Sequence, residues 1–272
     1  MREDQSVAEM ANEVLMRQAK ARAERSGEPI EEAMEVVLDT EAGKLLKELR
    51  DGPLGEESVE ETQVEVARER AEDEARAFLE SARQSGERFE ALYVLAITTG
   101  LRRGELLGLR WDDADLELGT LRVGRALVRE GGRHTLGETK TRRGRRQINL
   151  TPRTVNALKA HRKKQLEEKM KLAGLYKDHG LIFASGVGTP INPENLIKRS
   201  FKPLLEKAGL PKIRFHDLRH TCATLLLGRC VHPKLVQELL GHATIAMTLD
   251  TYSHYLPSMG DQTAGAMGNA FG

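Results

Sequence analysis

Apolar residues recur at helical spacing through the first fifty positions of the chain. Between 5 and 25 they are separated by three or four residues, which places them on one face of a helix. The same pattern returns over 29–50, after a break at Ser26-Gly27. We therefore expect a small antiparallel helix pair, which ends at the Gly- and Pro-containing segment 51–55.

The apolar pattern weakens over 56–72, where acidic residues dominate and large apolar side chains are few. This segment is expected to be an exposed helix or partly disordered. Apolar residues return at Phe78 and Leu79, which open an amphipathic helix, and 89–98 is apolar enough to form a buried helix. Gly100 is expected to end that buried helix.

Strand-like segments mark the middle of the chain, with turns predicted at Gly131-Gly132 and Arg143-Gly144. The strand-like segments are 119–129, 133–140 and 145–150, with a further short one at 181–184. Helical patterns fill most of the remainder: 103–109, 151–173, 192–208, 216–228, 233–240 and 244–251. The sequence therefore predicts a mainly α fold with a small three-stranded antiparallel sheet, in the α+β class.

The charge of the chain is divided unevenly along its length. Residues 1–75 carry 10 basic and 22 acidic residues, whereas the remainder carries 32 basic and 19 acidic residues, so the formal net charge of +1 hides the division. Such an asymmetry favours a polyanionic partner for the basic part. The simpler alternative is that both parts are solvated faces, but the basic runs coincide with the motifs described below, which favours nucleic acid.

No apolar run is long enough to span a bilayer, and the N-terminal residues lack the apolar core of a signal peptide. Cys222 and Cys230 are eight positions apart, which is about 12 Å along a continuous helix and too far for a disulfide. We therefore expect two reduced thiols in a cytoplasmic protein.

The candidate chemistry lies in the last third of the chain and in one segment near position 100. His216 precedes Arg219 by one helical turn, and His242 and Tyr252 follow in that order. A tyrosine oxygen can attack phosphorus, arginines can neutralise the non-bridging oxygens, and histidines can hydrogen-bond the phosphate and move protons. A second arginine is then required, and Arg102 supplies it.

Four segments carry a resemblance to a known family: TTGLRRGELLGLRW (98–111), ETKTRRGRRQINL (138–150), HDLRHTCATLL (216–226) and LLGHATIAMTLDTYSH (239–254). Over roughly 73–256 the chain resembles the catalytic domain of the tyrosine site-specific recombinases of the phage-integrase type. Four motifs in the family's order are far more specific than any one of them alone.

The resemblance implies a role for each matching residue. Tyr252, rather than its neighbour Tyr255, is expected to be the nucleophile, because the family's tyrosine stands before a Ser/Thr-His pair. Arg102 and Arg219 would clamp the phosphate, and His216 and His242 would contact it. Glu105 matches the family's acidic residue, which could orient Arg102 or His216 or form an exposed ion pair. His220 and His254 are interpreted as structural.

Lys140 matches the family's Lys-Thr-x-x-x-x-Arg pattern and is expected to be the general acid that protonates the 5′ oxygen. The alternative is that Lys140 belongs to a basic patch on the same hairpin that contacts the DNA backbone. We expect phosphate contacts from that hairpin at Arg142, Arg143, Arg145 and Arg146. Zinc at His216 and His220 is not expected, because position 217 is not Glu and a clear third ligand is missing. No cofactor is implied.

The resemblance implies cleavage and rejoining of double-stranded DNA through a 3′-phosphotyrosyl intermediate, in site-specific recombination or integration. It also implies a DNA-dependent homo-oligomer and is compatible with accessory recombination proteins. The main alternative is a non-catalytic or truncated DNA-binding or regulatory relative of an integrase. A type IB topoisomerase shares the chemistry but fits the Thr-Tyr-Ser-His segment and the chain length less well.

We expect three parts along the chain: an acidic helical segment over 1–72, the catalytic domain over 73–256 and a tail over 257–272. Family members usually carry a separate helical core-binding domain before the catalytic domain. Here the preceding segment is acidic and resembles no DNA-binding module, so the usual core-binding domain is expected to be missing.

Overall fold

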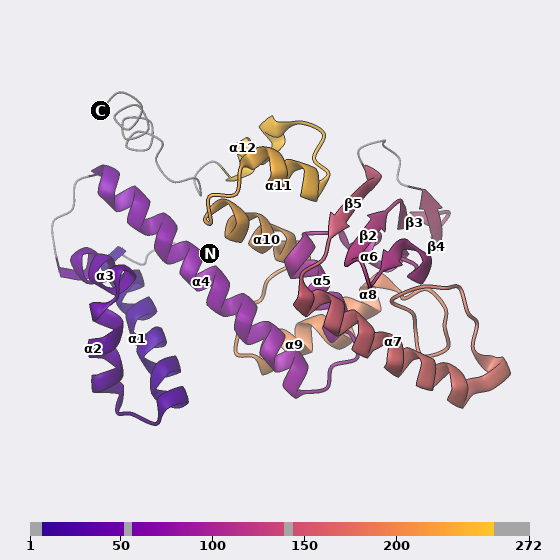
Figure 1. Cartoon of the computed structure of the whole chain (residues 1–272), viewed down its shortest axis with the longest axis horizontal. Coiled ribbons are helices and arrows are strands. Elements are labelled where there is room, and N and C mark those ends of the chain that lie inside the picture. Colours follow the sequence, from indigo (N-terminus) through magenta and orange to yellow (C-terminus); the bar gives the residue numbers. More distant parts are fainter. Residues whose placement is uncertain (1–6, 52–55, 139–143, 253–272) are drawn as a thin grey trace. The chain divides into compact units, whose positions relative to one another are not determined.

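The computed structural model describes residues 7–51, 56–138 and 144–252 of the chain (Figure 1). The chain divides into two compact units, with the boundary between Glu72 and Asp73. This boundary falls inside the long helix α4 (Glu56–Gln84). The acidic segment 56–72, which was expected to be an exposed helix or partly disordered, is therefore helical.

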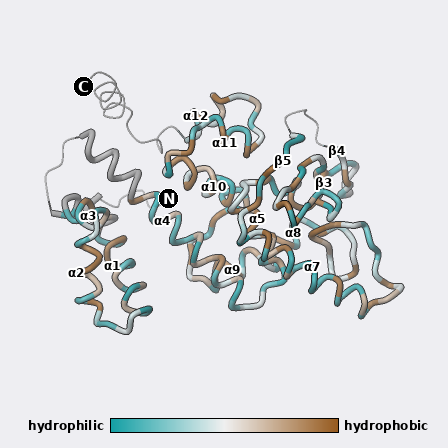
Figure 2. Tube along the Cα trace, viewed as in Figure 1, coloured by the Kyte–Doolittle hydropathy of each residue, from teal (hydrophilic) through white to brown (hydrophobic). Residues whose placement is uncertain are grey.

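The first unit consists of α1 (Val7–Ser26), α2 (Ile30–Asp39), α3 (Glu41–Asp51) and the beginning of α4. Helices α1 and α2 pack against each other, as expected for the helix pair, and α3 also packs on α1. Hydrophobic and hydrophilic positions alternate along α1 and α2 (Figure 2), which is the pattern of helices with one buried face. The core of this unit is small: Ala11, Val14, Leu15, Val37, Leu46 and Val66.

The single helix predicted over 29–50 was wrong, because the chain breaks at Thr40. The backbone of Thr40 is extended (φ −71°, ψ 155°), and its Oγ1 accepts a hydrogen bond of 2.9 Å from the Gly43 amide. This side chain therefore caps the start of α3. A Cβ on Gly43 would lie 1.9 Å from the Val37 carbonyl oxygen, so only glycine permits this close turn.

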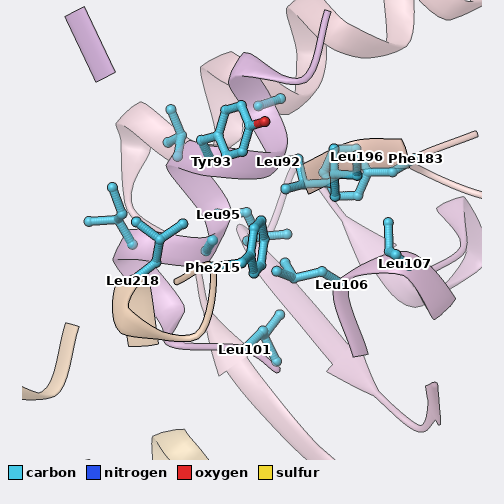
Figure 3. Close-up of a cluster of buried hydrophobic side chains, with 14 of the residues drawn as sticks. Leu92, Tyr93, Leu95, Leu101, Leu106, Leu107, Phe183, Leu196, Phe215 and Leu218 are labelled. Atoms are coloured by element: carbon cyan, nitrogen blue, oxygen red, sulfur yellow. The ribbon is translucent and has the colours of Figure 1, made fainter. Parts of the chain in front are cut away.

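The core of the second unit is built around α5 (Glu90–Thr99), eight of whose ten residues are buried. Figure 3 shows part of this core, with Tyr93 and Leu95 of α5 close to Phe215 and Leu218. Helices α7 (Pro152–Leu172) and α10 (Asp217–Leu227) both pack on α5. The prediction of a buried helix over 89–98 is confirmed.

The prediction of a small antiparallel sheet is confirmed, but the strands form two sheets instead of one. The first has the order β1-β2-β5, and the second is the hairpin β3-β4. Their bounds are β1 (Ala114–Asp115), β2 (Thr120–Val123), β3 (Arg125–Glu130), β4 (Arg133–Glu138) and β5 (Arg146–Asn149).

The continuous strand predicted over 119–129 was wrong, because Gly124 separates β2 from β3. Glycine weakens a strand interior and often marks a bend, which is what allows β2 and β3 to join different sheets. In β2, Leu121 pairs with Ile148 of β5, and in the hairpin Leu127 pairs with Leu136. The turn at Gly131-Gly132 is confirmed, and both glycines have positive φ.

The predicted helix over 192–208 is continuous but irregular, with a π-helical turn (Ile197–Phe201) between α8 (Pro193–Leu196) and α9 (Lys202–Lys207). Short 3-10 turns occur at Trp111–Asp113 and Ala173–Leu175. The strand predicted over 181–184 was wrong: Leu181 and Ala184 form only isolated bridges. The second unit ends with α11 (Pro233–Leu240) and α12 (Ile245–Tyr252). None of the described helices has both the length and the apolar composition needed to cross a membrane.

Candidate active site

Helix α6 (Arg103–Gly108) presents Arg102 and Glu105, and its position is set by close packing on β3. A Cβ on Gly104 would lie 2.9 Å from the Leu127 carbonyl oxygen. A Cβ on Gly108 would lie 2.8 Å from the Ala126 Cα. The two glycines therefore allow the helix backbone to approach the strand more closely than any side chain would.

Glu105 is buried, with 4% of its surface exposed, and it holds two arginines together. Its Oε1 accepts from Nη1 of Arg102 at 3.0 Å, and its Oε2 accepts from the Arg102 amide at 3.0 Å and from Nη2 of Arg146 at 3.0 Å. Burial alone would raise the pKa of Glu105, but the hydrogen bonds and charges of Arg146 and Arg102 outweigh it and lower that pKa. Glu105 is therefore ionised at neutral pH and fixes the position of Arg102.

Arg219 on α10 is a buried cation with an incomplete set of hydrogen bonds. Its side chain is almost fully buried, and its Nη1 donates to the Gly100 carbonyl at 2.7 Å. Its Nη2 is buried and has no hydrogen-bond partner among the described residues. Burial and the charge of Arg102 lower the pKa of Arg219 to about 10. Because an unpaired buried donor on a cation is costly, this site favours an anion.

The Gly100 carbonyl accepts the hydrogen bond from Arg219, and its position is set by the turn at this residue. Gly100 ends α5, as predicted. The residue has a left-handed backbone (φ 61°), and a Cβ there would lie 2.5 Å from a methyl carbon of Leu240. The left-handed conformation therefore favours glycine, and a larger residue would also displace the Leu240 side chain.

His242 follows the C-terminal end of α11, where Gly241 has a left-handed backbone. Its Nδ1 lies 2.9 Å from Oγ1 of Thr248, and its carbonyl accepts from Nε2 of Gln237 at 3.1 Å. Burial and the charges of Arg219, Arg102 and Arg146 lower the pKa of His242 to about 4. The imidazole is therefore neutral at neutral pH, and a phosphate bound beside it would partly offset the three positive charges around it.

Tyr252 is buried at the end of α12, with 3% of its surface exposed. Its hydroxyl lies 2.7 Å from Nδ1 of His220, and the rings of His220 and His216 are also in edge contact. Burial is the main cause that lowers the pKa of both histidines. The sequence interpretation of His220 as structural missed this contact, because the two residues are 32 positions apart.

The four basic residues expected to contact phosphate differ in their environments. Arg145 is exposed and forms an ion pair with Glu138. Arg146 is instead nearly buried, with 9% of its side chain exposed, and its donors are directed to protein acceptors. Lys140, Arg142 and Arg143 lie outside the described residues, as do His254 and the competing Tyr255. The structure thus brings together Arg102, Glu105, Arg146, His216, Arg219, His220, His242 and Tyr252 in one unit.

A mainly helical unit with small antiparallel sheets is the fold of the catalytic domains of tyrosine recombinases. The chain belongs to the phage integrase family, because that family's sequence model matches residues 69–259.

Two relatives illustrate the similarity in sequence. A XerC-like tyrosine recombinase of Caldanaerobacter subterraneus is 40% identical over 188 residues, which are 63% of this chain and 47% of the relative. The transposase of transposon Tn916 from Enterococcus faecalis is 30% identical over 198 residues, which are 70% of this chain and 47% of the relative. The chain therefore spans about half the length of the curated relatives that it matches.

Solved structures show the likeness in fold. One is the integrase of transposon Tn1549 in complex with transposon right-end DNA, with a TM-score of 0.59 at 21% identity. The match covers 98% of this chain and 86% of the integrase chain in that structure. The match to the XerA recombinase has a TM-score of 0.54 at 20% identity. It covers 96% of this chain and 99% of the XerA chain. Because these likenesses span nearly the whole chain, they include helices that precede residue 69.

Proposed function

We propose that this chain cleaves and rejoins DNA strands with Tyr252 as the nucleophile, in site-specific recombination or integration. The observation that carries the proposal is the buried guanidinium of Arg219, whose Nη2 has no hydrogen-bond partner among the described residues. Arg102, His242 and Tyr252 all lie near enough to interact electrostatically with Arg219. A singly charged phosphodiester is the anion that such a set of cationic and neutral donors fits.

In the proposed reaction, the Tyr252 oxygen attacks phosphorus as its proton passes to His220, whose Nδ1 lies 2.7 Å from the hydroxyl, and the bond from phosphorus to the 5′ oxygen breaks. The 5′ oxygen leaves as a hydroxyl after taking a proton, for which Lys140 is the family's donor. A 3′-phosphotyrosyl bond remains, and the attack of a second 5′-hydroxyl reverses the steps and releases Tyr252. Because the phosphotyrosyl bond conserves the energy of the cleaved bond, rejoining needs no ATP.

The other residues divide into phosphate contacts and positioning groups. Arg102 and Arg219 would neutralise the non-bridging oxygens, whose charge grows as the five-coordinate transition state forms. His216 and His242 would donate hydrogen bonds to the same phosphate. Glu105 would hold Arg102 in place, since it accepts from both its backbone and its guanidinium.

The partner in this proposal is double-stranded DNA, because the known structures of similar fold include an integrase bound to transposon DNA. Exchange of strands between two sites requires several protomers, so we also propose a DNA-dependent homo-oligomer. A cytoplasmic location is part of the same proposal, and it agrees with two free cysteines, of which Cys222 is buried.

The experiment that tests the proposal is covalent trapping. The protein is incubated in EDTA with nicked duplexes taken from the DNA that flanks its own gene, beside a Tyr252→Phe variant. We expect a denaturant-resistant protein–DNA band that is absent from the variant. If the folded wild-type protein binds DNA but forms no such band, the alternative of a non-catalytic DNA-binding relative is supported instead. The low exposure of Tyr252, with 3% of its surface accessible, is the observation that favours this alternative.

A further inference from the structure

Arg146 is the residue whose environment departs most from its expected role on the DNA surface. It is the first residue of β5 and belongs to a run of basic residues that the sequence assigns to phosphate contacts. Yet 9% of its side chain is exposed, compared with 59% for the adjacent Arg145. A side chain as buried as Arg146 has little surface to offer a DNA backbone.

The guanidinium of Arg146 joins three segments that are distant in the sequence. Its Nη2 donates to Oε2 of Glu105 at 3.0 Å, and its Nη1 is 3.4 Å from Oε1 of the same carboxylate. Its Nε donates to the Leu239 carbonyl at 2.7 Å, and Nη1 also lies 3.4 Å from the Gly144 carbonyl. One side chain thus connects β5 with α6 and with the last turn of α11.

Each of these contacts acts on a neighbour that carries proposed chemistry. The Leu239 carbonyl is in the last helical turn of α11, where carbonyls lack helical partners and a cation is favourable. His242 follows Leu239 by three residues, so the contact fixes the segment that presents it. Glu105, in turn, is bonded to the backbone and the guanidinium of Arg102.

We propose that Arg146 is a positioning residue that pairs with Glu105 and holds Arg102 and the His242 segment in place, and that it is not a contact to DNA. The proposal rests on the function proposed above. A lysine could not replace the arginine, because one ammonium cannot form a paired bond to a carboxylate and reach a carbonyl on another helix as well. Loss of Arg146 would leave Glu105 buried with Arg102 as its remaining cationic hydrogen-bond partner among the described residues.

The test compares single-turnover cleavage and DNA binding for Arg146→Ala, Arg146→Lys and the wild-type chain. We expect cleavage at saturating DNA to fall on the order of 100-fold in both variants, since small displacements of catalytic groups have effects of this size. The dissociation constant and its dependence on salt should stay at wild-type values. Arg145→Ala is the comparator for a phosphate contact: it should weaken binding and reduce the salt slope by about 1. Arg83→Ala removes an exposed arginine of α4 that pairs with Glu80 and controls for surface charge.

A double-mutant cycle with Glu105→Gln identifies the route by which Arg146 acts. If Arg146 works through Glu105, the double variant should lose little more activity than the more damaged single variant. The cleavage rate of Arg146→Ala should also decline with acid at a higher pH than wild type, because burial of Glu105 is then less opposed. Circular dichroism shows whether Arg146→Ala is folded, and Arg146→Lys keeps the test valid where it is not.

A wild-type cleavage rate in Arg146→Lys, or a smaller salt slope in Arg146→Ala, would overturn this proposal. Independent, multiplicative losses in the double-mutant cycle would do the same. Absence of a covalent product with the wild-type chain is a separate result, because it contradicts the proposed function itself. In that case the salt slope of Arg146→Ala still decides whether Arg146 contacts DNA.

Discussion

The hydroxyl of Tyr252 lies 2.7 Å from Nδ1 of His220, and burial lowers the pKa of that imidazole. A neutral His220 with its hydrogen on Nε2 can accept the phenolic hydrogen bond and orient the oxygen before DNA arrives. We therefore predict that His220→Ala reduces the single-turnover cleavage rate by about 100-fold, the effect typical of a lost proton acceptor. DNA affinity should not change.

The control for this prediction is His179→Ala, which removes an exposed histidine between α7 and α8. His220→Asn, which keeps a hydrogen-bonding side chain, should recover part of the rate if His220 mainly orients the phenol. A wild-type cleavage rate in His220→Ala would show that His220 is needed neither to accept the proton of Tyr252 nor to orient its hydroxyl.

Motif spacing selected residues that lie in one unit of the structure, but it did not give the contacts that connect them. Arg102, Arg219, His242 and Tyr252 are named by the order of the motifs, and the structure brings them into one unit. The contact between Arg146 and Glu105 spans 41 positions of the chain. Spacing along one helix or strand cannot give such a contact, because it depends on how separate elements pack.

Helix α6 depends on Gly104 and Gly108 for its place against β3. A Cβ on Gly108 would lie 2.8 to 3.0 Å from three backbone atoms of Ala126, and a strand backbone cannot move as a side chain can. We predict that Gly108→Ala destabilises the second unit by about 1–3 kcal/mol, as overpacking does, although alanine is the better helix former. Arg102 and Glu105 would move with the helix, so cleavage should fall as well.

Urea unfolding followed by the fluorescence of Trp111, the one tryptophan of the chain, measures the stability of the second unit. Gly174→Ala is the matched control, since a Cβ there would meet nothing within 4 Å. If Gly108→Ala is as stable as Gly174→Ala, the contact between α6 and β3 does not limit the position of the helix.

The type of each main element was predictable from periodicity, whereas the interruptions were not. The break at Thr40 follows from a threonine cap combined with the close approach of Gly43 to Val37. The break at Gly124 assigns β2 and β3 to different sheets. Both depend on a partner elsewhere in the fold, so apolar spacing alone extended one helix and one strand too far.

At the scale of the whole molecule, the change from an acidic to a basic sequence occurs near the boundary between the two structural units. The unit boundary at Glu72–Asp73 lies close to position 75, where the acidic excess ends. Composition predicted no family likeness for the acidic part, yet the likeness to solved recombinases covers up to 98% of the chain. Fold is determined by helix packing, which tolerates wide changes in surface charge, so composition is a weak guide to it.

The histidines make the stability of the DNA-free protein depend on pH. The pKa values of His161, His216, His220 and His242 are all lowered, mainly by burial. An unfolded histidine has a pKa near about 6.5, so below that pH the unfolded chain binds more protons than the folded one. Stability is therefore complete above about pH 6.5 and is lost as the pH falls toward the lowered values. Carboxylates with lowered pKa, such as Glu105, add to the loss only at more acidic pH.

We predict that the urea midpoint reported by Trp111 falls steadily from about pH 7 to about pH 5. His242→Gln should flatten this dependence by about 1 kcal/mol, a value reduced for the solvent exposure of a half-buried side chain. His161→Gln is the comparison from outside the site, because the imidazole of His161 is hydrogen-bonded to the Ile182 carbonyl. Duplex DNA should weaken the His242 contribution and leave that of His161 unchanged, because a bound phosphate offsets the arginine charges that lower the pKa of His242. A midpoint that is constant over this range, with or without DNA, would mean that the cationic site does not control protonation of His242.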